Sequence, residues 1–342
     1  MKTNIFPINN AQGTGTIDLY CLPSAGSSAS MYSEWKNYAP QWLNICPIEY
    51  SGHGTRIREE LIHNPDIITQ EITSAILNRN KRKFILFGHS LGTALIWRIV
   101  KKLQSLGQES RLEMIVISGR RETSTLANEP RGRHLLPRED FIQAVLKYSG
   151  LPQELLNQNE LLDFFLPILR NDFHLNDYLV DDASTLTCCP LIAVAGDSDP
   201  DIISPDMMIK WRKYSEQWLG FYPLPGNHFY LNKIENIKEI IKLISTHVYQ
   251  LSILDKCLSK KGEISMENIV REEIRKTLNI DMDGISNKDN LIEHGLHSLA
   301  IMQLVESLST KLNKRFKYGD FAASPTIEKW VDIIQKQCDN KM

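Results

Sequence analysis

A serine between two glycines is the feature that most constrains how this chain folds. Residues 88–92, Gly-His-Ser-Leu-Gly, directly follow the apolar run 84–87 and open the amphipathic stretch 91–103. This pattern is typical of a strand–turn–helix junction so tight that side chains at both glycine positions would collide with neighbouring backbone. Ser90 would then stand at a helix N-terminus, where free N–H groups and the helix dipole favour negative charge. We expect a nucleophilic Ser90; the alternative is a passive serine in a glycine-rich turn.

The apolar runs indicate a sheet with helices on both faces. Besides 84–87, the runs that predict buried strands are residues 17–22, 42–48, 114–117 and 191–195. Amphipathic stretches lie between them, as at 91–103 and 203–218, and this alternation predicts a mostly parallel sheet in an α/β fold. Residues 137–178 carry helical patterns at 140–147 and 152–170 but no strand. We expect this insertion to form a helical lid, spanning about 130–185, over one end of the sheet.

The C-terminal part of the chain has a different character. A length of 342 residues predicts about two domains. After residue 265 no strand pattern remains, and helical periodicity marks 269–278, 298–312 and 326–337, with a loop-like stretch at 287–295. The sequence therefore predicts one domain at 1–252, a linker at 253–264 and a small all-α four-helix bundle at 265–342.

Composition argues against several classes of function. The formal net charge is -2, so nothing indicates a nucleic-acid surface or a membrane patch. No apolar run approaches the ~20 residues that span a bilayer, and the polar first ten residues lack the apolar core of a signal peptide. The six cysteines have no metal-ligand spacing, which favours reduced thiols, a cytoplasmic location and no metal site; they are Cys21, Cys46, Cys188, Cys189, Cys257 and Cys338. We expect a monomer.

Two clusters of basic residues stand out along the chain. They are residues 81–83, Lys-Arg-Lys, and the pair Arg131 and Arg133. We expect both clusters to be solvated faces, since charge runs of this length are usually exposed. The alternative is a basic patch that docks an acidic partner surface.

An acid and a base follow the serine in chain order. Asp199 comes shortly after the apolar run 191–195, and His228 lies before the last helical stretch of the first domain. The order Ser, Asp, His at the ends of strands is that of α/β-hydrolases. Asp197 and Asp201 lie close enough in sequence to compete with Asp199 for the acid role.

These three residue types predict acyl transfer through a serine. His228 would take the Ser90 proton as general base, and Asp199 would fix the imidazole tautomer and stabilise the imidazolium. The Leu91 N–H would be one donor to the oxyanion of the tetrahedral intermediate. Ser90 would then carry an acyl group that water clears.

The N-terminal part, roughly residues 15–250, resembles the type II thioesterases of nonribosomal peptide and polyketide assembly lines. The matching blocks are the loop 22–30, Trp35, the lid segments 136–141 and 166–173, and the histidine loop 226–229. The resemblance implies a serine thioesterase with an α/β-hydrolase sheet and a helical lid. It also implies the triad Ser90, Asp199 and His228.

Two loops beside the serine refine that resemblance. It implies that Ala25 supplies a second oxyanion N–H, with Gly26 or Ser24 as alternatives. The family usually has Pro-Gly-Arg-Gly after the second strand, where residues 51–54 read Ser-Gly-His-Gly, and its Arg-Ala-Asp-Phe lid segment reads Arg-Asn-Asp-Phe at 170–173. We expect the lost arginine to alter the entrance for the substrate arm.

A second serine lies before a helix in the C-terminal bundle. Residues 289–299 resemble the phosphopantetheine attachment site of acyl and peptidyl carrier proteins, and 325–330 resemble the start of the last carrier helix, particularly in aryl carriers. The resemblance implies a covalent 4'-phosphopantetheine on Ser298; the alternative is a plain N-cap serine. No strand precedes Ser298 and Ala300 replaces the second glycine, so this is not a second hydrolase serine. His297 replaces the usual Asp, which a modifying transferase often contacts.

Together these features predict a thioesterase that hydrolyses acyl or aminoacyl thioesters from phosphopantetheine carriers, for editing or release, with its own carrier domain in cis. The expected partners are a phosphopantetheinyl transferase and either the carrier domains of a nonribosomal peptide or polyketide synthase or an adenylating enzyme, in antibiotic or siderophore biosynthesis. The alternatives are a loading protein whose hydrolase domain acts in trans, a catalytically weak binding scaffold, or an acyltransferase that uses the same acyl-enzyme.

Overall fold

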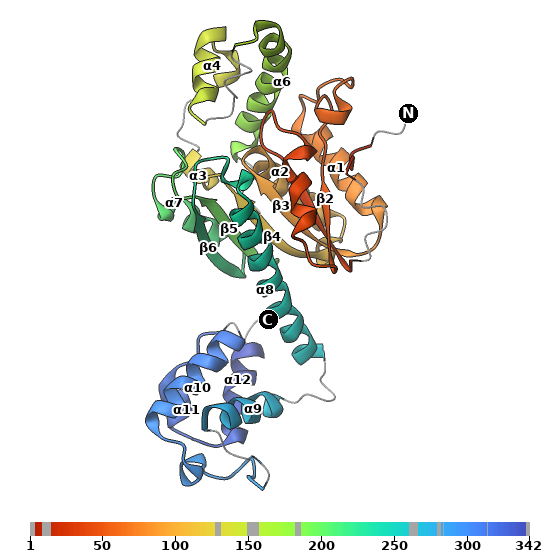
Figure 1. Cartoon of the computed structure of the whole chain (residues 1–342). Helices are drawn as coiled ribbons and strands as arrows, with labels where there is room; N and C mark the ends of the chain where they lie inside the picture. The colour runs from red at the N-terminus through yellow and green to blue at the C-terminus, as the bar shows by residue number, and fades with distance from the viewer. Residues whose placement is uncertain are drawn as a thin grey trace. The chain divides into compact units, whose positions relative to one another are not determined.

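The computed structural model of the protein describes residues 4–8, 15–126, 131–148, 157–181, 186–259, 266–278, 282, 284–312 and 314–339 (Figure 1). The chain divides into two compact units, residues 1–243 and residues 244–342. We refer to them as the first and the second unit and describe each by itself.

The first unit is built on a six-stranded parallel sheet with the order β2-β1-β3-β4-β5-β6. The strands are β1 (Ile17–Leu22), β2 (Leu43–Pro47), β3 (Lys83–His89), β4 (Leu112–Ser118), β5 (Leu191–Gly196) and β6 (Trp218–Leu224). The predicted α/β sheet is therefore confirmed. Strand order reverses beside β1, and in such sheets the loops after the two strands at this point open a crevice. Leu22 pairs with Gly88, so the loop after β1 lies next to Ser90.

Strand β6 was not predicted from the sequence. Residues 203–218 were expected to form one amphipathic stretch, but they form the short helix α7 (Pro205–Ile209), a 3-10 turn (Lys210–Tyr214) and the start of β6. As an edge strand, β6 is only partly buried, and Gly220 and Pro223 interrupt its otherwise apolar sequence. An edge strand tolerates Pro223 because one of its sides needs no ladder hydrogen bonds.

Three longer helices accompany the sheet: α1 (Pro65–Arg79), α2 (Leu91–Ser105) and α8 (Ile234–Ser259). Helix α2 is buried along most of its length, and its Trp97 stacks on Trp211 with ring centroids 5.4 Å apart. This burial fixes the first turn of α2, which follows Ser90 directly, against the core of the sheet. Among the described residues, no helix is long and apolar enough to cross a membrane.

Two helices form the predicted insertion over one end of the sheet, α4 (Arg138–Leu146) and α6 (Asn159–Tyr178) (Figure 1). Helix α6 begins later and ends later than the expected 152–170, and residues 149–156 lie outside the described part. The two helices share a small apolar core made of Phe141, Ile142, Val145, Leu162, Leu166 and Leu169. We call α4 and α6 together the lid.

The second unit contains the helices α9 (Met266–Leu278), α10 (Ser298–Lys311), α11 (Tyr318–Ala322) and α12 (Ile327–Asp339), as a carrier-like bundle requires. Its core includes the buried Trp330, whose Nε1–H donates to Phe321 O at 2.9 Å. The expected linker at 253–264 is helical over its first part, because α8 continues to Ser259. No glycine or proline interrupts that stretch before Gly262. Residues 260–264 lie outside the described part, so the domain boundaries stay a prediction.

Four of the six cysteines can be described. Cys21, Cys46, Cys188 and Cys189 are free thiols, and burial raises the pKa of each. The side chains of Cys257 and Cys338 lie outside the described part. The four described thiols are therefore poor nucleophiles, because the thiolate is the reactive form.

Candidate active site and carrier serine

Ser90 occupies the turn between β3 and α2 in a strained backbone conformation. Its φ is 53° and its ψ is -108°, and it is the one non-glycine residue of the described chain with positive φ. A Cβ on Gly88 would lie 2.5 Å from the carbonyl carbon of Gly92, and a Cβ on Gly92 would lie 2.2 Å from Leu22 O. As the sequence predicts, a side chain at either glycine would collide with neighbouring backbone. The strained backbone of Ser90 persists only where the surrounding structure imposes it.

His228 pairs with one of the three neighbouring aspartates. Its Nδ1 lies 2.8 Å from Asp199 Oδ2, and both side chains are buried. Asp197 instead accepts hydrogen bonds from the Gly226 N–H and the Ser198 hydroxyl. Asp201 forms an ion pair at 3.1 Å with Lys147, which directly follows the lid helix α4. Of the three aspartates, Asp199 is therefore the one that the structure brings into contact with His228.

A chain of buried, hydrogen-bonded polar side chains lies beside His228. His89 Nδ1 is 2.8 Å from Ser118 Oγ, which is 2.6 Å from the Tyr230 hydroxyl. The His89 and His228 ring centroids are 4.9 Å apart. Burial and the neighbouring His228 hold the pKa of His89 well below its usual range, so His89 adds no positive charge beside the base. Sequence reasoning missed Ser118 and Tyr230 because they come from different elements and carry no motif.

The hydrogen bonding of the backbone near Ser90 distinguishes Ala25 from Gly26 as the second donor to the oxyanion. The Gly26 N–H donates to Asp172 Oδ2 at 2.7 Å and is therefore engaged. Among the described residues, the Ala25 and Leu91 N–H groups have no hydrogen-bond partner, and Ala25 lines the same cavity as Ser90. Two free donors beside the serine are what an oxyanion hole requires. The geometry favours Ala25 over Gly26.

A buried ion pair ties the lid to this loop. Asp172, on α6, accepts both the Gly26 N–H and His53 Nε2, the latter at 2.9 Å. Burial alone lowers the pKa of His53, but the Asp172 carboxylate and its hydrogen bond outweigh burial and raise it overall. His53 is the residue that stands where the resembling family usually has arginine. When protonated, His53 is therefore a positively charged partner for Asp172 of the lid. Unlike the charge of an arginine, the charge of His53 depends on pH.

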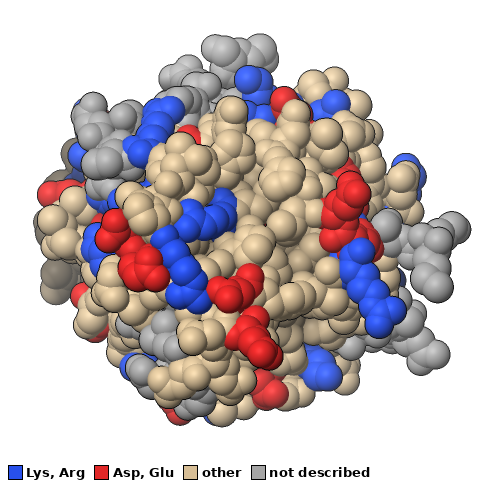
Figure 2. Space-filling view, turned by 90° about the horizontal axis from the view of Figure 1, so that it is seen from above, with Lys and Arg blue, Asp and Glu red and all other residues tan. Residues whose placement is uncertain are grey.

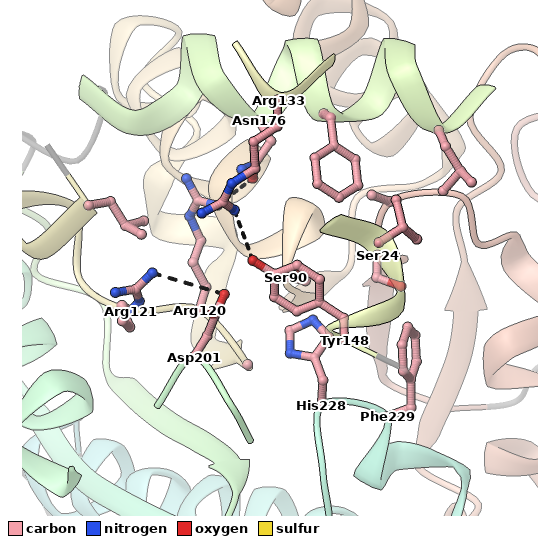
Figure 3. A pocket seen from close by; sticks show the side chains of 16 residues that line it. Ser24, Ser90, Arg120, Arg121, Arg133, Tyr148, Asn176, Asp201, His228 and Phe229 are labelled. Carbon is pink, nitrogen blue, oxygen red and sulfur yellow. Dashed lines mark hydrogen bonds and ion pairs between the residues drawn. The ribbon is translucent and has the colours of Figure 1, made fainter. Parts of the chain in front are cut away.

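The cavity in front of Ser90 has a volume of about 90 Å³. Figure 3 shows Ser90 and His228 facing it, with Arg120, Arg121 and Arg133 gathered on one side in this view. The lid closes over it, and the Tyr148 ring centroid lies 5.3 Å from that of His228. The chamber is small and basic.

Of the two basic clusters predicted to be solvated, residues 81–83 are exposed, whereas Arg133 of the second cluster lines the cavity. In the 81–83 cluster, Lys83 pairs with Glu113 at 2.8 Å and Arg82 with Asp18 at 3.5 Å, both partly exposed. Arg133 corrects the expectation for the second cluster, because it lines the cavity and donates to the Tyr148 hydroxyl at 2.9 Å. On the face shown in Figure 2, acidic and basic side chains are interspersed, without a broad area of one sign.

A second, more open groove adjoins the cavity, since Phe229 lines both. The groove runs along the loop after β1, the turn that holds His53 and the lid helix α6. Its apolar lining includes Met31, Ile57 and Phe164. A slender, mostly uncharged chain fits such a lining.

Ser298 is exposed at the first position of α10. The preceding His297 caps the helix, its Nδ1 accepting the Ala300 N–H at 3.3 Å. An exposed hydroxyl at the N-terminus of a long helix suits a covalent phosphodiester, because the helix dipole favours negative charge there. Ser298 therefore fits the attachment of a phosphopantetheine group.

Comparisons with known proteins agree with this geometry. Residues 18–248 match the thioesterase domain family and residues 268–334 match the phosphopantetheine attachment site family. Linear gramicidin dehydrogenase LgrE of Brevibacillus parabrevis is 28% identical over 217 residues, 63% of this chain and 81% of that protein. Gramicidin S biosynthesis protein GrsT of Aneurinibacillus migulanus is 27% identical over 236 residues, 68% of this chain and 91% of that protein.

A solved structure, that of ClbQ from the colibactin NRPS/PKS pathway, matches with a TM-score of 0.62 at 27% identity, over 70% of this chain and 99% of that one. The thioesterase match spans more than half of the present chain, and the attachment-site match follows it. This chain therefore belongs to the thioesterase domain family of α/β-hydrolases, enzymes that act on thioesters, and it carries a C-terminal domain for a serine-linked 4'-phosphopantetheine.

Proposed function

We propose that the protein hydrolyses short acyl or aminoacyl thioesters on phosphopantetheine carrier domains of nonribosomal peptide or polyketide biosynthesis, as an editing or release enzyme. The observation that carries this proposal is the strained Ser90 facing a small cavity together with the His228–Asp199 pair. The relatives named for gramicidin biosynthesis and for the colibactin pathway support the biosynthetic setting.

The roles of the residues follow from their positions. His228 accepts the Ser90 proton while Ser90 Oγ attacks the thioester carbonyl, and Asp199 stabilises the imidazolium that forms. The Ala25 and Leu91 N–H groups stabilise the oxyanion. His228 then protonates the departing thiolate, which leaves an acyl group on Ser90. A water deprotonated by His228 releases the acid and restores the Ser90 hydroxyl.

The size of the cavity supports a small acyl group. Pockets for drug-sized ligands measure roughly 300–1,000 Å³, whereas this one has about 90 Å³. A long peptide would not fit without movement of the lid, so removal of short wrong loads suits the chamber better than release of a full-length product. The adjoining apolar groove offers a route for the carrier's arm, past Phe229 to Ser90.

We propose further that Ser298 carries the arm and that the carrier serves the hydrolase in cis. When attached there, the phosphopantetheine group supplies a thiol that holds the acyl group as a thioester. The domain limits 1–252, 253–264 and 265–342 belong to this proposal, as do a monomeric state and a cytoplasmic location. The partners would be a phosphopantetheinyl transferase and either synthase carrier domains or an adenylating enzyme. The presence of both family matches in one chain favours the cis arrangement.

Intact mass spectrometry tests this function. The wild type, Ser90→Ala and Ser298→Ala are incubated with a broad phosphopantetheinyl transferase and an acyl-coenzyme A, and mass is followed over time. We expect Ser298→Ala to gain no arm, and the acyl mass to fade in the wild type but persist in Ser90→Ala. Equal persistence in the wild type and Ser90→Ala would show that this load is not removed in cis. The hydrolase would then be tested on a separate acylated carrier, which is the arrangement in trans.

A further inference from the structure

The catalytic cavity contains a buried cation without an acidic partner. The Arg120 side chain lines the cavity that holds Ser90, and the residue is only 7% exposed. Its Nη1 donates to the neutral Asn176 of the lid helix α6, and among the described residues its Nη2 has no hydrogen-bond partner. A buried guanidinium without a carboxylate is unusual, since unpaired buried charge is strongly unfavourable.

The nearby carboxylates are committed to other groups; among them, Asp177 accepts the Gly132 N–H and lies 3.2 Å from His134 Nδ1. Glu122 is paired with Lys213 at 2.8 Å and accepts the hydroxyls of Ser124 and Tyr214. Asp201 pairs with Lys147 at 3.1 Å and has Arg121 at 4.0 Å. Among the described residues, no carboxylate forms an ion pair with Arg120. The cavity side of Arg120 is therefore open to an anion from outside the protein.

Arg120 remains charged at neutral pH. Burial and the neighbouring Arg121 lower its pKa to about 10, which still leaves the guanidinium protonated. Arg133 adds a further positive charge to the same wall of the cavity (Figure 3). Three arginines and one aspartate thus give this wall a net positive charge.

The position of Arg120 is fixed on two sides. Its carbonyl accepts a hydrogen bond from the buried Trp211 Nε1 at 2.8 Å, and its guanidinium is held by Asn176. The preceding Gly119 has φ +58°, and a Cβ there would lie 2.5 Å from His89 Cε1. A guanidinium held in place in this way loses little conformational freedom when it binds a carboxylate.

We propose that Arg120 binds a free carboxylate on the acyl group, so that the enzyme prefers thioesters of short dicarboxylic acids over those of the matching monocarboxylic acids. This inference rests on the proposed function, because it assigns the substrate class of the same site. The cavity holds the reacting carbonyl at Ser90 and the second carboxylate at Arg120. The acyl group would supply the acidic partner that the protein itself does not.

The test compares malonyl and propionyl thioesters of pantetheine, which have equal carbon number and differ in the carboxylate. Values of kcat/KM are measured for the wild type, Arg120→Gln and Arg120→Lys, with Ser90→Ala giving the background rate. Arg138→Gln, which removes an exposed arginine bound to Asp163, is the matched control. Binding of the non-hydrolysable amide analogues of both substrates is measured by calorimetry for the same proteins.

We expect the wild type to prefer the malonyl substrate, and Arg120→Gln to lower the malonyl-to-propionyl ratio about 10- to 100-fold, the usual cost of losing a charge-assisted hydrogen bond. Arg120→Lys should recover part of the ratio, and Arg138→Gln should keep it. If Arg120 had only a structural role, Arg120→Gln would lower kcat/KM equally for both substrates. The malonyl-to-propionyl ratio would then be unchanged, which would overturn the inference.

The binding data separate this inference from the proposed function. If Ser90→Ala hydrolyses both thioesters as fast as the wild type, the proposed mechanism at Ser90 fails. If only the propionyl thioester is turned over, or the two amide analogues bind the wild type equally, the carboxylate preference fails. Tighter binding of the malonyl analogue that disappears in Arg120→Gln supports the inference even where turnover is slow.

Discussion

At the scale of single residues, the turn that holds Ser90 has no room for side chains at the two glycines that flank it. Ser90 sits at positive φ because the two flanking glycines allow strand β3, helix α2 and the end of β1 to approach within contact distance. A displacement of about 1 Å at such a centre commonly costs about 100-fold in rate. The consequences can be tested at Gly92 and at Asp199, which contacts His228.

Gly92→Ala is expected to lower kcat for a soluble acyl thioester by about 100-fold. The added Cβ would lie 2.2 Å from the Leu22 carbonyl oxygen, so the first turn of α2 must move and carry Ser90 with it. Steady-state kinetics measure the effect, and circular dichroism checks that the sheet is intact. Gly319→Ala is the control, because nothing lies within 4 Å of its added Cβ. Wild-type turnover in Gly92→Ala would contradict the geometry at Ser90.

Asp199→Asn is expected to lower kcat by roughly 10³- to 10⁴-fold, because the amide cannot hold His228 in the required tautomer. The matched control is Asp197→Asn, two residues away, where the carboxylate bonds Gly226 and Ser198 and does not contact His228. We expect that variant to retain activity close to the wild type. Comparable losses in both variants would mean that the aspartates act through the loop and not through the histidine.

At the scale of elements, the lid is joined to the loop after β1 through the His53–Asp172 pair. Asp172 holds the Gly26 N–H with the same oxygen that contacts His53, so the position of α6 and the shape of the loop are coupled. The neighbouring Ala25 lines the cavity in front of Ser90. Titration of His53 is then expected to affect the stability of the first unit.

The free energy of unfolding is expected to show a pH dependence that disappears in His53→Asn. Because the folded pKa of His53 is raised, its stabilising effect is complete below the ordinary value of 6.5 and is lost as pH rises through the folded pKa. We expect His53→Asn to destabilise the protein by about 1.5–3 kcal/mol at low pH, with a smaller deficit in alkaline buffer. Denaturant unfolding of both proteins across pH measures this, and a deficit that grows with pH would refute the assignment.

Helix α10 begins with a cap, His297, that directly precedes Ser298. His297→Ala is expected to destabilise the second unit by about 1 kcal/mol, because the Ala300 N–H loses its acceptor. His297→Asp should keep the cap and raise the rate of arm attachment at Ser298, since carboxylates are strong caps and modifying transferases often contact this position. Thermal melting and mass spectrometry of the modified protein measure the two effects. A slower attachment in His297→Asp would show that histidine is the better partner here.

At the scale of the whole molecule, a hydrolase and a carrier share one chain. If the arm on Ser298 is served in cis, the acyl group is lost in a first-order process that dilution does not change. We expect the half-life of the acyl group on the wild type to be constant over a roughly hundredfold dilution, because the effective concentration of a tethered carrier does not depend on the protein concentration. A half-life that lengthens in proportion to dilution would establish hydrolysis in trans. Acylated Ser90→Ala mixed with wild type measures the trans rate directly.

Local patterns in the sequence were enough for five of the six strands and for the positions of the two serines and the histidine. Strand β1 was placed at its observed limits, Ser90 at its turn and Ser298 at the start of α10. These features depend on neighbours within a few residues: an apolar run, a glycine pair, a helix start. The edge strand β6 escaped prediction because its burial is partial and because Gly220 and Pro223, which are poor strand formers, lie within it.

Only the tertiary structure decided which side chains meet. By sequence, Asp197 and Asp201 competed with Asp199 for the acid role, and the fold brought Asp199 to His228. The fold also moved Arg133 from an expected solvated face into the cavity and left Arg120 without a carboxylate. The reason is physical: backbone conformation depends on adjacent residues, whereas ion pairs and cavities join segments such as β4 and α6 that are far apart in the chain. Sequence alone therefore determined the kind of chemistry, and the packing of the lid on the sheet decided the shape and charge of the chamber in which it occurs.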